Sequence, residues 1–127
     1  ALLRVGDIMH SGAGLPLAGA NALMSDVLIT MSSKGFGTAG VTDHDGKLVG
    51  IITDGDLRRH MSPGLTAQTA AAVMTRSPAT ISPAALVAEA VHIMNAGPKR
   101  ITCLFVTEAQ RPIGIIHIHD CLRAGTK

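Results

Sequence analysis

The stretch Gly50-Ile51-Ile52-Thr53-Asp54-Gly55-Asp56-Leu57 decides the fold, because it returns later in the chain as Gly114-Ile115-Ile116-His117-Ile118-His119-Asp120-Cys121. The repeat extends on the N-terminal side: Ile8-Met9 is matched by Val73-Met74 and Val41-Thr42 by Val106-Thr107, with the same separation in both cases. A solenoid needs three or more repeats to bury a continuous core, so two copies predict a pseudo-symmetric pair. Halves of about 60 residues are marginal alone, and we expect them to pack together.

The composition describes a small aliphatic module. Of the 127 residues, 46% are hydrophobic and only 2% are aromatic, with no Trp and no Tyr, so the core must consist of Val, Ile, Leu, Met and Ala. No apolar run reaches the roughly 18 residues that a membrane span requires, and no signal peptide is recognisable. We therefore expect a soluble, cytoplasmic chain with no membrane partner. The start at Ala1, not Met, indicates a fragment of a longer protein.

Charge and cysteine usage argue against a nucleic-acid-binding protein and against a disulfide-rich protein. The net charge is only +2 and the basic residues are mostly scattered, whereas nucleic-acid binding normally needs a basic stripe and, for single strands, aromatic stacking platforms. Nucleic acid is therefore not an expected partner. Cys103 and Cys121 are isolated and lack the density of a disulfide framework, which predicts buried free thiols.

Each half predicts the element order β-α-β-β-α. In the first half, Asn21 is predicted to cap a helix that runs to about Lys34, with Leu23, Val27 and Met31 on its apolar face. Two β-rich runs over residues 38–42 and 48–53 follow, joined by an Asp-Gly turn that is typical of a hairpin. A short helix carrying Leu57 and Met61, capped by Thr53 or Asp54, completes the half. The extended piece around Pro16 cannot be a central strand, because proline lacks the donor.

The second half repeats this order over residues 80–124. Residues 62–71 are poor in large apolar groups and are predicted to connect the halves. The sequence thus predicts an α/β (α+β) fold, with residues 1–66 as the first half-domain with its connector and residues 67–127 as the second.

These residues carry a resemblance to a known family. Each half resembles a cystathionine-beta-synthase-type (CBS) domain, through the pattern Gly-hydrophobic-hydrophobic-Thr-x-x-Asp at Gly50 to Asp56 and its recurrence at Gly114 to Asp120. The tandem is similar to the CBS pair called a Bateman module, and the resemblance covers essentially the whole chain. Such pairs commonly bind an adenine or other nucleotide in the cleft between their halves, and they commonly form disc-like dimers.

A narrower resemblance points to bacterial D-arabinose 5-phosphate isomerases. Residues 5–10, 53–59 and 117–125 resemble the C-terminal CBS pair of that family, in which the last stretch usually reads His-x-His-Asp-Leu-Leu-Arg-Ala-Gly; Cys121 departs, standing for a Leu. The resemblance implies an N-terminal sugar isomerase (SIS) domain that interconverts D-ribulose 5-phosphate and D-arabinose 5-phosphate for Kdo and lipopolysaccharide synthesis. We expect the fragment itself to lack this activity.

The motif suggests how a nucleotide is held in the first half. Asp56 can accept hydrogen bonds from both ribose hydroxyls, and Thr53 can donate to a phosphate at the helix start. Gly50 and Gly55 would let the ligand approach the backbone closely. Simple helix capping by Thr53 and Asp56 is an alternative that is compatible with ligand binding.

The second half departs from the pattern at the phosphate position. It keeps the carboxylate as Asp120 but has His117 in place of the threonine, and a histidine still donates to phosphate, more strongly when protonated. His117, His119 and Asp120 together also raise the possibility of a metal site. The two histidines straddle a strand-to-helix junction without a further ligand cluster, so a role in ligand binding, in a domain contact or as satisfied histidines is favoured over a metal.

Three further cations are candidates for an anionic ligand. Lys34 and Lys99 recur before the first strand of each hairpin, and Arg58 follows Asp56. Each could reach a phosphate or carboxylate, or be a solvated cation at a helix end. Arg58 could equally contact the SIS domain.

Two functions remain open. The first is a regulatory module that senses a nucleotide or nucleotide-sugar, with CMP-Kdo, AMP and ATP as candidate effectors, and changes the activity of the attached isomerase. The alternative is a structural dimerisation module that binds no ligand, in a parent that is a homodimer or tetramer. A catalytic role of the fragment has little support, because no catalytic set can be placed in one cleft.

Overall fold

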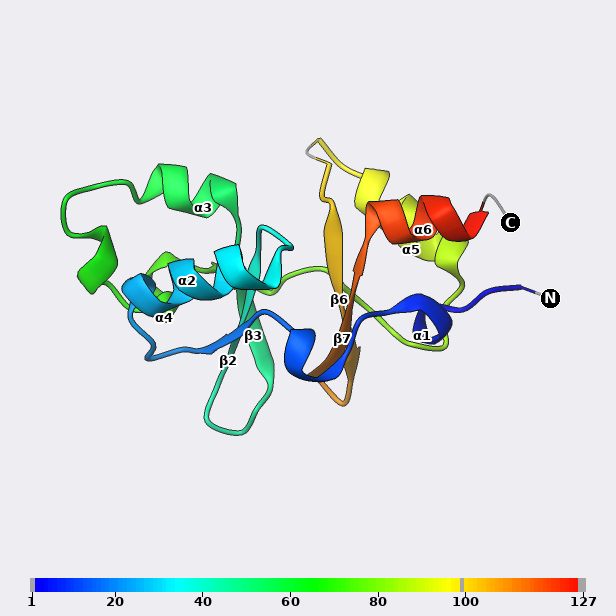
Figure 1. The fold of residues 1–127 in the computed structure, drawn as a ribbon, viewed down its shortest axis with the longest axis horizontal. Helices are drawn as coiled ribbons and strands as arrows, with labels where there is room; N and C mark the ends of the chain where they lie inside the picture. Colours follow the sequence, from blue (N-terminus) through cyan, green and yellow to red (C-terminus); the bar gives the residue numbers. More distant parts are fainter. Residues whose placement is uncertain (1, 99, 126–127) are drawn as a thin grey trace. The chain divides into compact units, whose positions relative to one another are not determined.

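The computed structural model describes residues 2–98 and 100–125 (Figure 1). The chain forms two compact units, which we describe separately. The central unit is Pro16–Pro78, and the terminal unit combines the residues up to Leu15 with those from Ala79 onward. The segment that opens the first sequence repeat thus belongs with the second hairpin.

The central unit is built on a sheet in the order β1-β2-β3-β4. Its strands are β1 (Leu17–Gly19), β2 (Ala39–Thr42), β3 (Leu48–Ile52) and β4 (Thr75–Arg76). Strand β1 runs parallel to β2, and the other pairs are antiparallel. Pro16 precedes the edge strand β1, which agrees with the exclusion of this segment from the middle of a sheet.

Helices α2 (Met24–Lys34), α3 (Asp54–Arg59) and α4 (Ala70–Val73) complete the central unit. Helix α2 buries Met24, Val27 and Met31 completely or nearly so in the core formed with β2, β3 and α4. Leu23, which the spacing predicts on this face, precedes the helix and is 46% exposed.

The predicted cap of α2 is wrong: the N-cap is Leu23, two residues after Asn21. No side-chain cap is needed, because another segment of the unit supplies the partners that the helix start lacks. The amide of Met24, at the start of α2, donates to the carbonyl of Gln68 at 2.8 Å. In return, the amide of Ala70, at the start of α4, donates to the carbonyl of Ala22 at 2.8 Å.

The segment predicted as a connector contributes to the core. Leu65, in a 3₁₀ turn over Leu65–Ala67, is only 6% exposed, and Ala70 is fully buried in the central cluster. Met61 lies beyond the end of α3 and is 68% exposed, so the helix is shorter than expected. Leu65 and Ala70 therefore bring a segment whose composition is that of a linker into the core.

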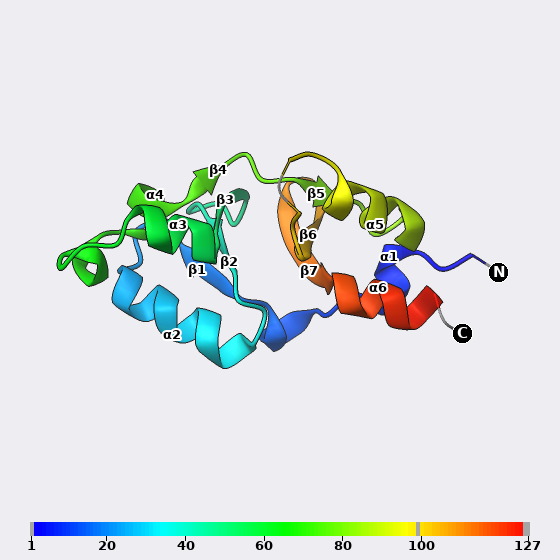
Figure 2. The same ribbon diagram turned by 90° about the horizontal axis from the view of Figure 1, so that it is seen from above.

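The terminal unit repeats the architecture. Its sheet has the order β5-β6-β7, with β5 (Thr80–Ile81) parallel to β6 (Cys103–Glu108) and β6 antiparallel to β7 (Arg111–His117). Helices α5 (Val87–Asn95) and α6 (Ile118–Gly125) are in contact with each other, and Figure 2 shows them beside the sheet. The predicted β-α-β-β-α order is confirmed in both units.

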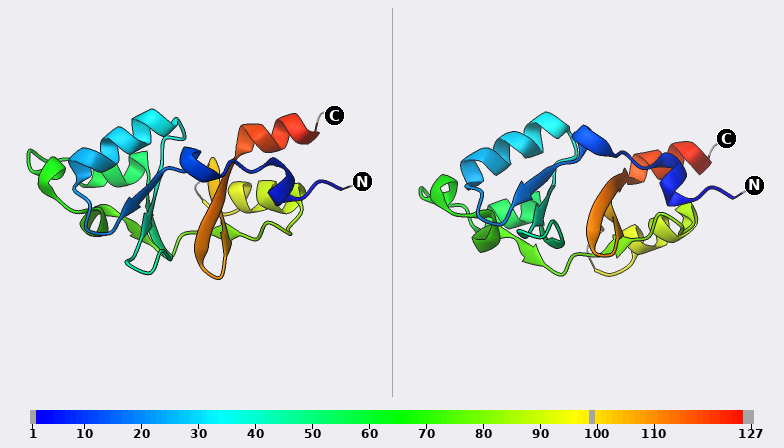
Figure 3. Two further views of the ribbon diagram at one scale, coloured as in Figure 1. Left: turned by 60° about the horizontal axis from the view of Figure 1, so that its bottom comes forward. Right: turned by 90° about the horizontal axis from the view of Figure 1, so that it is seen from below.

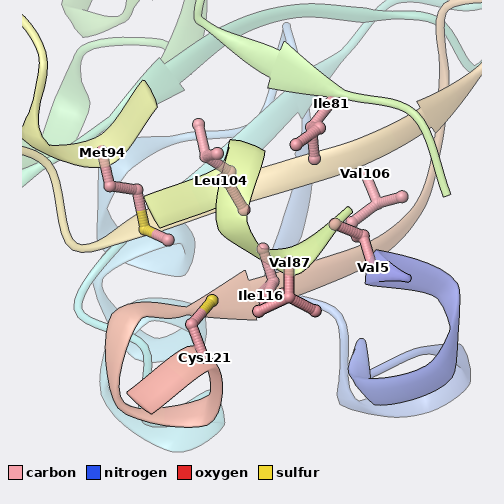
Figure 4. Close-up of a cluster of buried hydrophobic side chains, with 9 residues drawn as sticks. Val5, Ile81, Val87, Met94, Leu104, Val106, Ile116 and Cys121 are labelled. Atoms are coloured by element: carbon pink, nitrogen blue, oxygen red, sulfur yellow. The ribbon is translucent and has the colours of Figure 1, made fainter. Parts of the chain in front are cut away.

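Helix α1 (Val5–Ile8), from the start of the chain, contacts β7 and α6, and Figure 3 shows this dark blue segment from two further sides. His10 continues it as a bridge to Ile115, with reciprocal backbone hydrogen bonds of 2.9 Å. Val5 is fully buried among the aliphatic side chains of α5, β6 and β7 (Figure 4). The segment therefore plays the part in the terminal unit that α4 and β4 play in the central unit.

Two properties of the whole chain can be checked against the described residues. Neither Cys103 nor Cys121 forms a disulfide bond among the described residues, and Cys121 is buried while Cys103 is partly buried. None of the helices in residues 2–98 and 100–125 combines the length and apolar character that crossing a membrane requires.

Candidate functional site

The first half of the site lies where β3 passes into α3. Thr53 is the N-cap of α3 and forms a capping box with Asp56. The Thr53 amide donates to Oδ2 of Asp56 at 2.9 Å, and the Thr53 hydroxyl donates to the same oxygen at 3.1 Å. Just before this point, the buried hydroxyl of Thr38 donates to the carbonyl of Ile52 at 2.9 Å and holds the end of the strand. The junction is therefore fixed from both sides.

The other oxygen of Asp56 has partners from two further elements. Oδ1 accepts hydrogen bonds from the hydroxyl of Thr75, in β4, and from the guanidinium of Arg59, at the end of α3. Asp56 is only 2% exposed. Burial raises the pKa of Asp56, but the hydrogen bonds from Thr75, Thr53 and Arg59 outweigh that effect and hold the pKa below its ordinary value. A charged, buried and fully hydrogen-bonded carboxylate results.

The corresponding junction in the terminal unit joins β7 to α6. The amide of His117 donates to Oδ2 of Asp120 at 3.0 Å, and Arg123 donates to Oδ1. His10 takes the place of Thr75: its Nε2 lies 2.9 Å from Oδ2 of Asp120. Burial raises the pKa of Asp120, but the bonds from His117 and His10 and the charges of His10 and Arg123 lower it below its ordinary value. The carboxylate frame is thus built twice.

His117 and His119 lie together, as the sequence suggests, but they are joined through the backbone. The amide of His119 donates to Nδ1 of His117 at 3.0 Å, and the two ring centroids are 4.6 Å apart. Burial lowers the pKa of His117, and the nearby His119 lowers it further. Among the residues that the structure describes, no group of three or more His, Cys, Asp or Glu side chains is placed to hold a metal ion.

The motif glycine Gly50 does not serve the role predicted for it. A Cβ on Gly50 would overlap the side chain of Met74 and lie 2.9 Å from the carbonyl oxygen of Thr75. Gly114 is alike in this respect: a Cβ there would overlap Met9 and lie 2.9 Å from the carbonyl oxygen of His10. At each glycine, the space that a Cβ would occupy is filled by protein. The group that lies close to Gly50 is therefore the Met74 side chain and not a ligand.

Two of the three remaining candidate cations, Lys34 and Arg58, lie near the ends of helices. Lys34 is the last residue of α2, before Gly35 in the left-handed conformation, and is exposed. Arg58 is exposed in the last turn of α3, and it is the next residue, Arg59, that reaches Asp56. Lys99 lies outside the described residues. A Cβ on Gly55 would meet only Arg59 and Thr53, at ordinary contact distances.

A separate hollow of about 390 Å³ lies in the central unit, at the carboxyl ends of β1 and β2. Residues 19–22 and 42–44 line it. Because β3 runs antiparallel to β2, this hollow is at the opposite end of the sheet from Thr53. None of the candidate ligand residues that the structure describes lines it.

Sequence reasoning missed the residues that complete each carboxylate frame. Thr75 and His10 come from segments distant in the sequence, and they occupy equivalent positions of the repeat, directly after Met74 and Met9. Arg59 and Arg123 each lie three residues after a motif aspartate, on the same face of the helix. The (i, i+3) spacing is the available signal for the arginines.

Comparison with protein families gives this arrangement an identity. The CBS domain model matches the chain twice, over residues 5–63 and 70–127. The chain belongs to the CBS domain family. The two capping frames thus mark two CBS domains, and the expectation of a CBS pair is confirmed.

Sequence relatives show which proteins with a CBS pair this chain is similar to. The CBS pair is 42% identical, over 127 residues, to the arabinose 5-phosphate isomerase KdsD of Pseudomonas aeruginosa. The alignment covers 98% of this chain but only 38% of the relative. KdsD of Yersinia pestis is 37% identical, again with 98% and 38% coverage. The chain therefore spans well under half the length of the curated relatives that it matches.

Solved structures share the fold of the CBS pair. The CBS domain pair of protein MJ0100, in complex with 5′-methylthioadenosine and S-adenosyl-L-methionine, has a TM-score of 0.84 at 24% identity, with all of both chains covered. CBSX2 in complex with AMP has a TM-score of 0.81 at 22% identity, with 97% of this chain and 96% of that chain covered. At these identities the likeness shows the fold.

Proposed function

We propose that this CBS pair is the regulatory region of a cytoplasmic D-arabinose 5-phosphate isomerase and that it senses a nucleotide or nucleotide-sugar. The relation to KdsD, at 42% identity over 98% of the chain, supports the parent enzyme. Catalysis would belong to an N-terminal SIS domain in the remaining length, and this region would alter its activity through ligand binding.

The observation that carries the sensing role is the carboxylate frame built twice, at Asp56 and at Asp120. Both are ionised groups at the start of a helix, and an ionised carboxylate is the strongest acceptor for the two hydroxyls of a ribose. The complexes of CBSX2 with AMP and of MJ0100 with two adenosine derivatives support a nucleoside as the ligand class.

The neighbouring residues suggest how the rest of the ligand is held. Thr53 and His117 occupy equivalent positions and would donate to a phosphate or sugar carboxylate. Lys34, Arg58 and Lys99 remain candidates for the outer anionic groups. CMP-Kdo is our preferred effector, because its cytidine ribose suits the aspartates and its acidic sugar suits the imidazoles; AMP and ATP are the alternatives.

A thermal-shift titration against AMP, ATP, CMP, CMP-Kdo and arabinose 5-phosphate tests this proposal. A ligand at about 100 times its dissociation constant adds roughly 2.7 kcal/mol to the stability of the folded state, so a selective rise in Tm identifies the effector. Asp56→Asn and Asp120→Asn should reduce the shift. Asp26→Asn, which neutralises an exposed aspartate in the first turn of α2, is the matched control and should leave it unchanged.

A second candidate is a dimerisation module that binds no effector. The observation in its favour is that protein donors already satisfy Asp56, as helix capping alone would require. Large apolar side chains are also exposed on the helices, including Ile29 at 67% and Leu122 at 55%. A dimer by sedimentation that Ile29→Glu or Leu122→Glu dissociates, combined with no thermal shift for any ligand, would favour this role.

A further inference from the structure

Arg59 occupies the carboxylate to which the proposed effector must bind. Its guanidinium donates to Oδ1 of Asp56, the oxygen that also accepts the Thr75 hydroxyl. The amide and the hydroxyl of Thr53 engage Oδ2. An ionised carboxylate has about four lone-pair positions, and the protein fills four. A ribose can gain acceptors here only if a protein donor leaves.

The four donors differ in how easily they can leave. The Thr53 amide is fixed by the capping box, so its departure would unwind the start of α3. The Thr53 hydroxyl needs only to rotate, but it frees a single position. The Arg59 side chain is long and 54% exposed, whereas the carboxylate beneath it is 3% exposed. An ion pair with one partner in water is weak and separates at little cost.

The terminal unit contains the same pairing of an exposed arginine with a buried aspartate. Arg123 donates to Oδ1 of Asp120 with the same (i, i+3) spacing, and its side chain is 70% exposed while that of Asp120 is 9% exposed. The two aspartates have otherwise different neighbours, Thr53 and Thr75 in one unit and His117 and His10 in the other. The arginine is therefore a constant part of both frames.

We infer that Arg59 is a displaceable gate on Asp56: it neutralises the buried carboxylate when the effector is absent and must swing away before a ribose can bind. This inference rests on the proposed sensing function and adds the regulation of that site. The effector must supply the free energy that opens the gate, because its apparent affinity is reduced by the fraction of molecules in which the carboxylate is open. Removing the guanidinium should remove this penalty.

A gate and a phosphate contact at Arg59 predict opposite effects of its removal on nucleotide binding. If Arg59 served as a phosphate contact, its loss would weaken binding. If it is a gate, its loss strengthens binding. The expected size follows from the strength of a partly exposed ion pair: Arg59→Gln should tighten the binding of AMP by about two- to fivefold.

Arg58 provides a matched control on the same short helix. It is also exposed and carries the same charge, and it is not among the described donors to Asp56. Arg58→Gln removes the same long-range attraction for an anion without opening the carboxylate. Its affinity for AMP should equal that of the wild type or be weaker.

The experiment is isothermal titration of AMP into the wild-type chain, Arg59→Gln, Arg58→Gln and Asp56→Asn. Tighter binding by Arg59→Gln alone, abolished when Asp56→Asn is added, supports the gate. Binding by Arg59→Gln that is equal to or weaker than that of the wild type overturns it, and so does an equal tightening in Arg58→Gln. Arg59→Lys, with a melting temperature measured without ligand, replaces the glutamine variant if that variant does not fold; it should bind AMP more tightly than the wild type, though less so than the glutamine variant.

The failure of the sensing function looks different. If neither the wild type nor Arg59→Gln binds AMP, and CMP and CMP-Kdo as second and third probes also fail, no effector site exists and the gate falls with it. If the wild type binds but Asp56→Asn binds equally well, the effector is sensed elsewhere, and the inference about Arg59 fails while a sensing role stands.

Discussion

The two capping junctions share a frame and differ in what surrounds it. In both, a backbone amide donates to the aspartate three residues later, at 2.9 Å for Thr53 and 3.0 Å for His117, and an arginine three residues further on completes the pair. The third element differs: the Thr75 hydroxyl reaches Asp56, whereas the His10 imidazole reaches Asp120.

The groups that are the same in both units are those that the fold requires, and the groups that differ are those that could contact a ligand. The amide and the carboxylate lie at the start of the helix in both units, and the arginine lies in its last turn. All three are unchanged, although the two halves have diverged in most other positions. The neutral hydroxyls of Thr53 and Thr75 become imidazoles in the terminal unit. Hydroxyls keep their charge state over the physiological range, whereas imidazoles titrate within it. The two units should therefore respond differently to pH and to anions.

The largest expected loss of stability comes from replacing the two motif glycines, whose packing is the same in both units. Gly50→Ala and Gly114→Ala should each destabilise the fold by about 2–3 kcal/mol, because the new methyl group meets a methionine and a backbone carbonyl that cannot rotate away. Urea unfolding followed by circular dichroism measures both. As a control, Gly64→Ala adds a methyl group into open space and should cost far less. Unequal costs at Gly50 and Gly114 would show that the two frames are not packed alike.

Replacement of the two motif aspartates should reduce stability by unequal amounts. Asp56→Ala removes a carboxylate that is 2% exposed and accepts hydrogen bonds from the Thr53 amide and the Thr75 hydroxyl, and should cost about 2 kcal/mol. Asp120→Ala should cost about 1 kcal/mol, since His10, 47% exposed, and Arg123, 70% exposed, can turn to water. The same urea titration compares them. Equal losses would mean that burial of the carboxylate does not decide its contribution.

Much of this architecture is predictable from the repeat, because hydrophobic spacing, the hairpin turn and the motif threonine act locally. The tertiary partners are not. The start of α2 finds the carbonyl of Gln68, so Leu23 caps it without a polar side chain. Helix α5 repeats this solution, since the amide of Val87 donates to the carbonyl of Leu3 at 3.1 Å. The residue types at a helix start do not reveal hydrogen bonds to distant backbone carbonyls.

The candidate site is predictable in the same incomplete way. Thr53, Asp56, His117 and Asp120 can be recognised from the motif, and the structure places each at a helix start. Their use as ligand residues stays a prediction. The ligand contact expected of Gly50 is wrong because its real neighbour, Met74, comes from a distant segment of the chain and nothing local connects the two.

An intermediate effect of pH should distinguish the units. The pKa of His117 lies below its ordinary value because of burial and His119, so folding favours the neutral ring. The stability it contributes is present above about pH 6.5, the ordinary value, and is lost as the pH falls through the folded pKa. His119, Asp120, Arg123 and His10 are the charged or titratable groups around it. Urea unfolding at pH 7.5 and 5.5 should show a smaller loss in His117→Thr than in the wild type.

The reciprocal exchange sharpens this prediction. Thr53→His should place an imidazole at the equivalent position of the central unit and add pH dependence between pH 7.5 and 5.5, at a cost in overall stability from the lost capping hydroxyl. An unchanged pH dependence in both exchanges would show that the imidazole at this position is solvated and carries no part of the difference between the units.

The smallest effect concerns the two segments that pass from one unit to the other. Gly12, with φ +70°, and Ser77, with φ +53°, occupy matching positions of the repeat, and both adopt the left-handed conformation, which a side chain disfavours. Ser77→Gly should therefore stabilise the chain by about 0.5 kcal/mol, the relief of strain being partly offset by the greater freedom of glycine when unfolded. Gly12→Ser should cost about 1 kcal/mol. Melting temperatures of the two variants and of the double exchange, which should nearly restore the wild-type value, measure whether the crossings are equivalent; a stabilising Gly12→Ser would show that they are not.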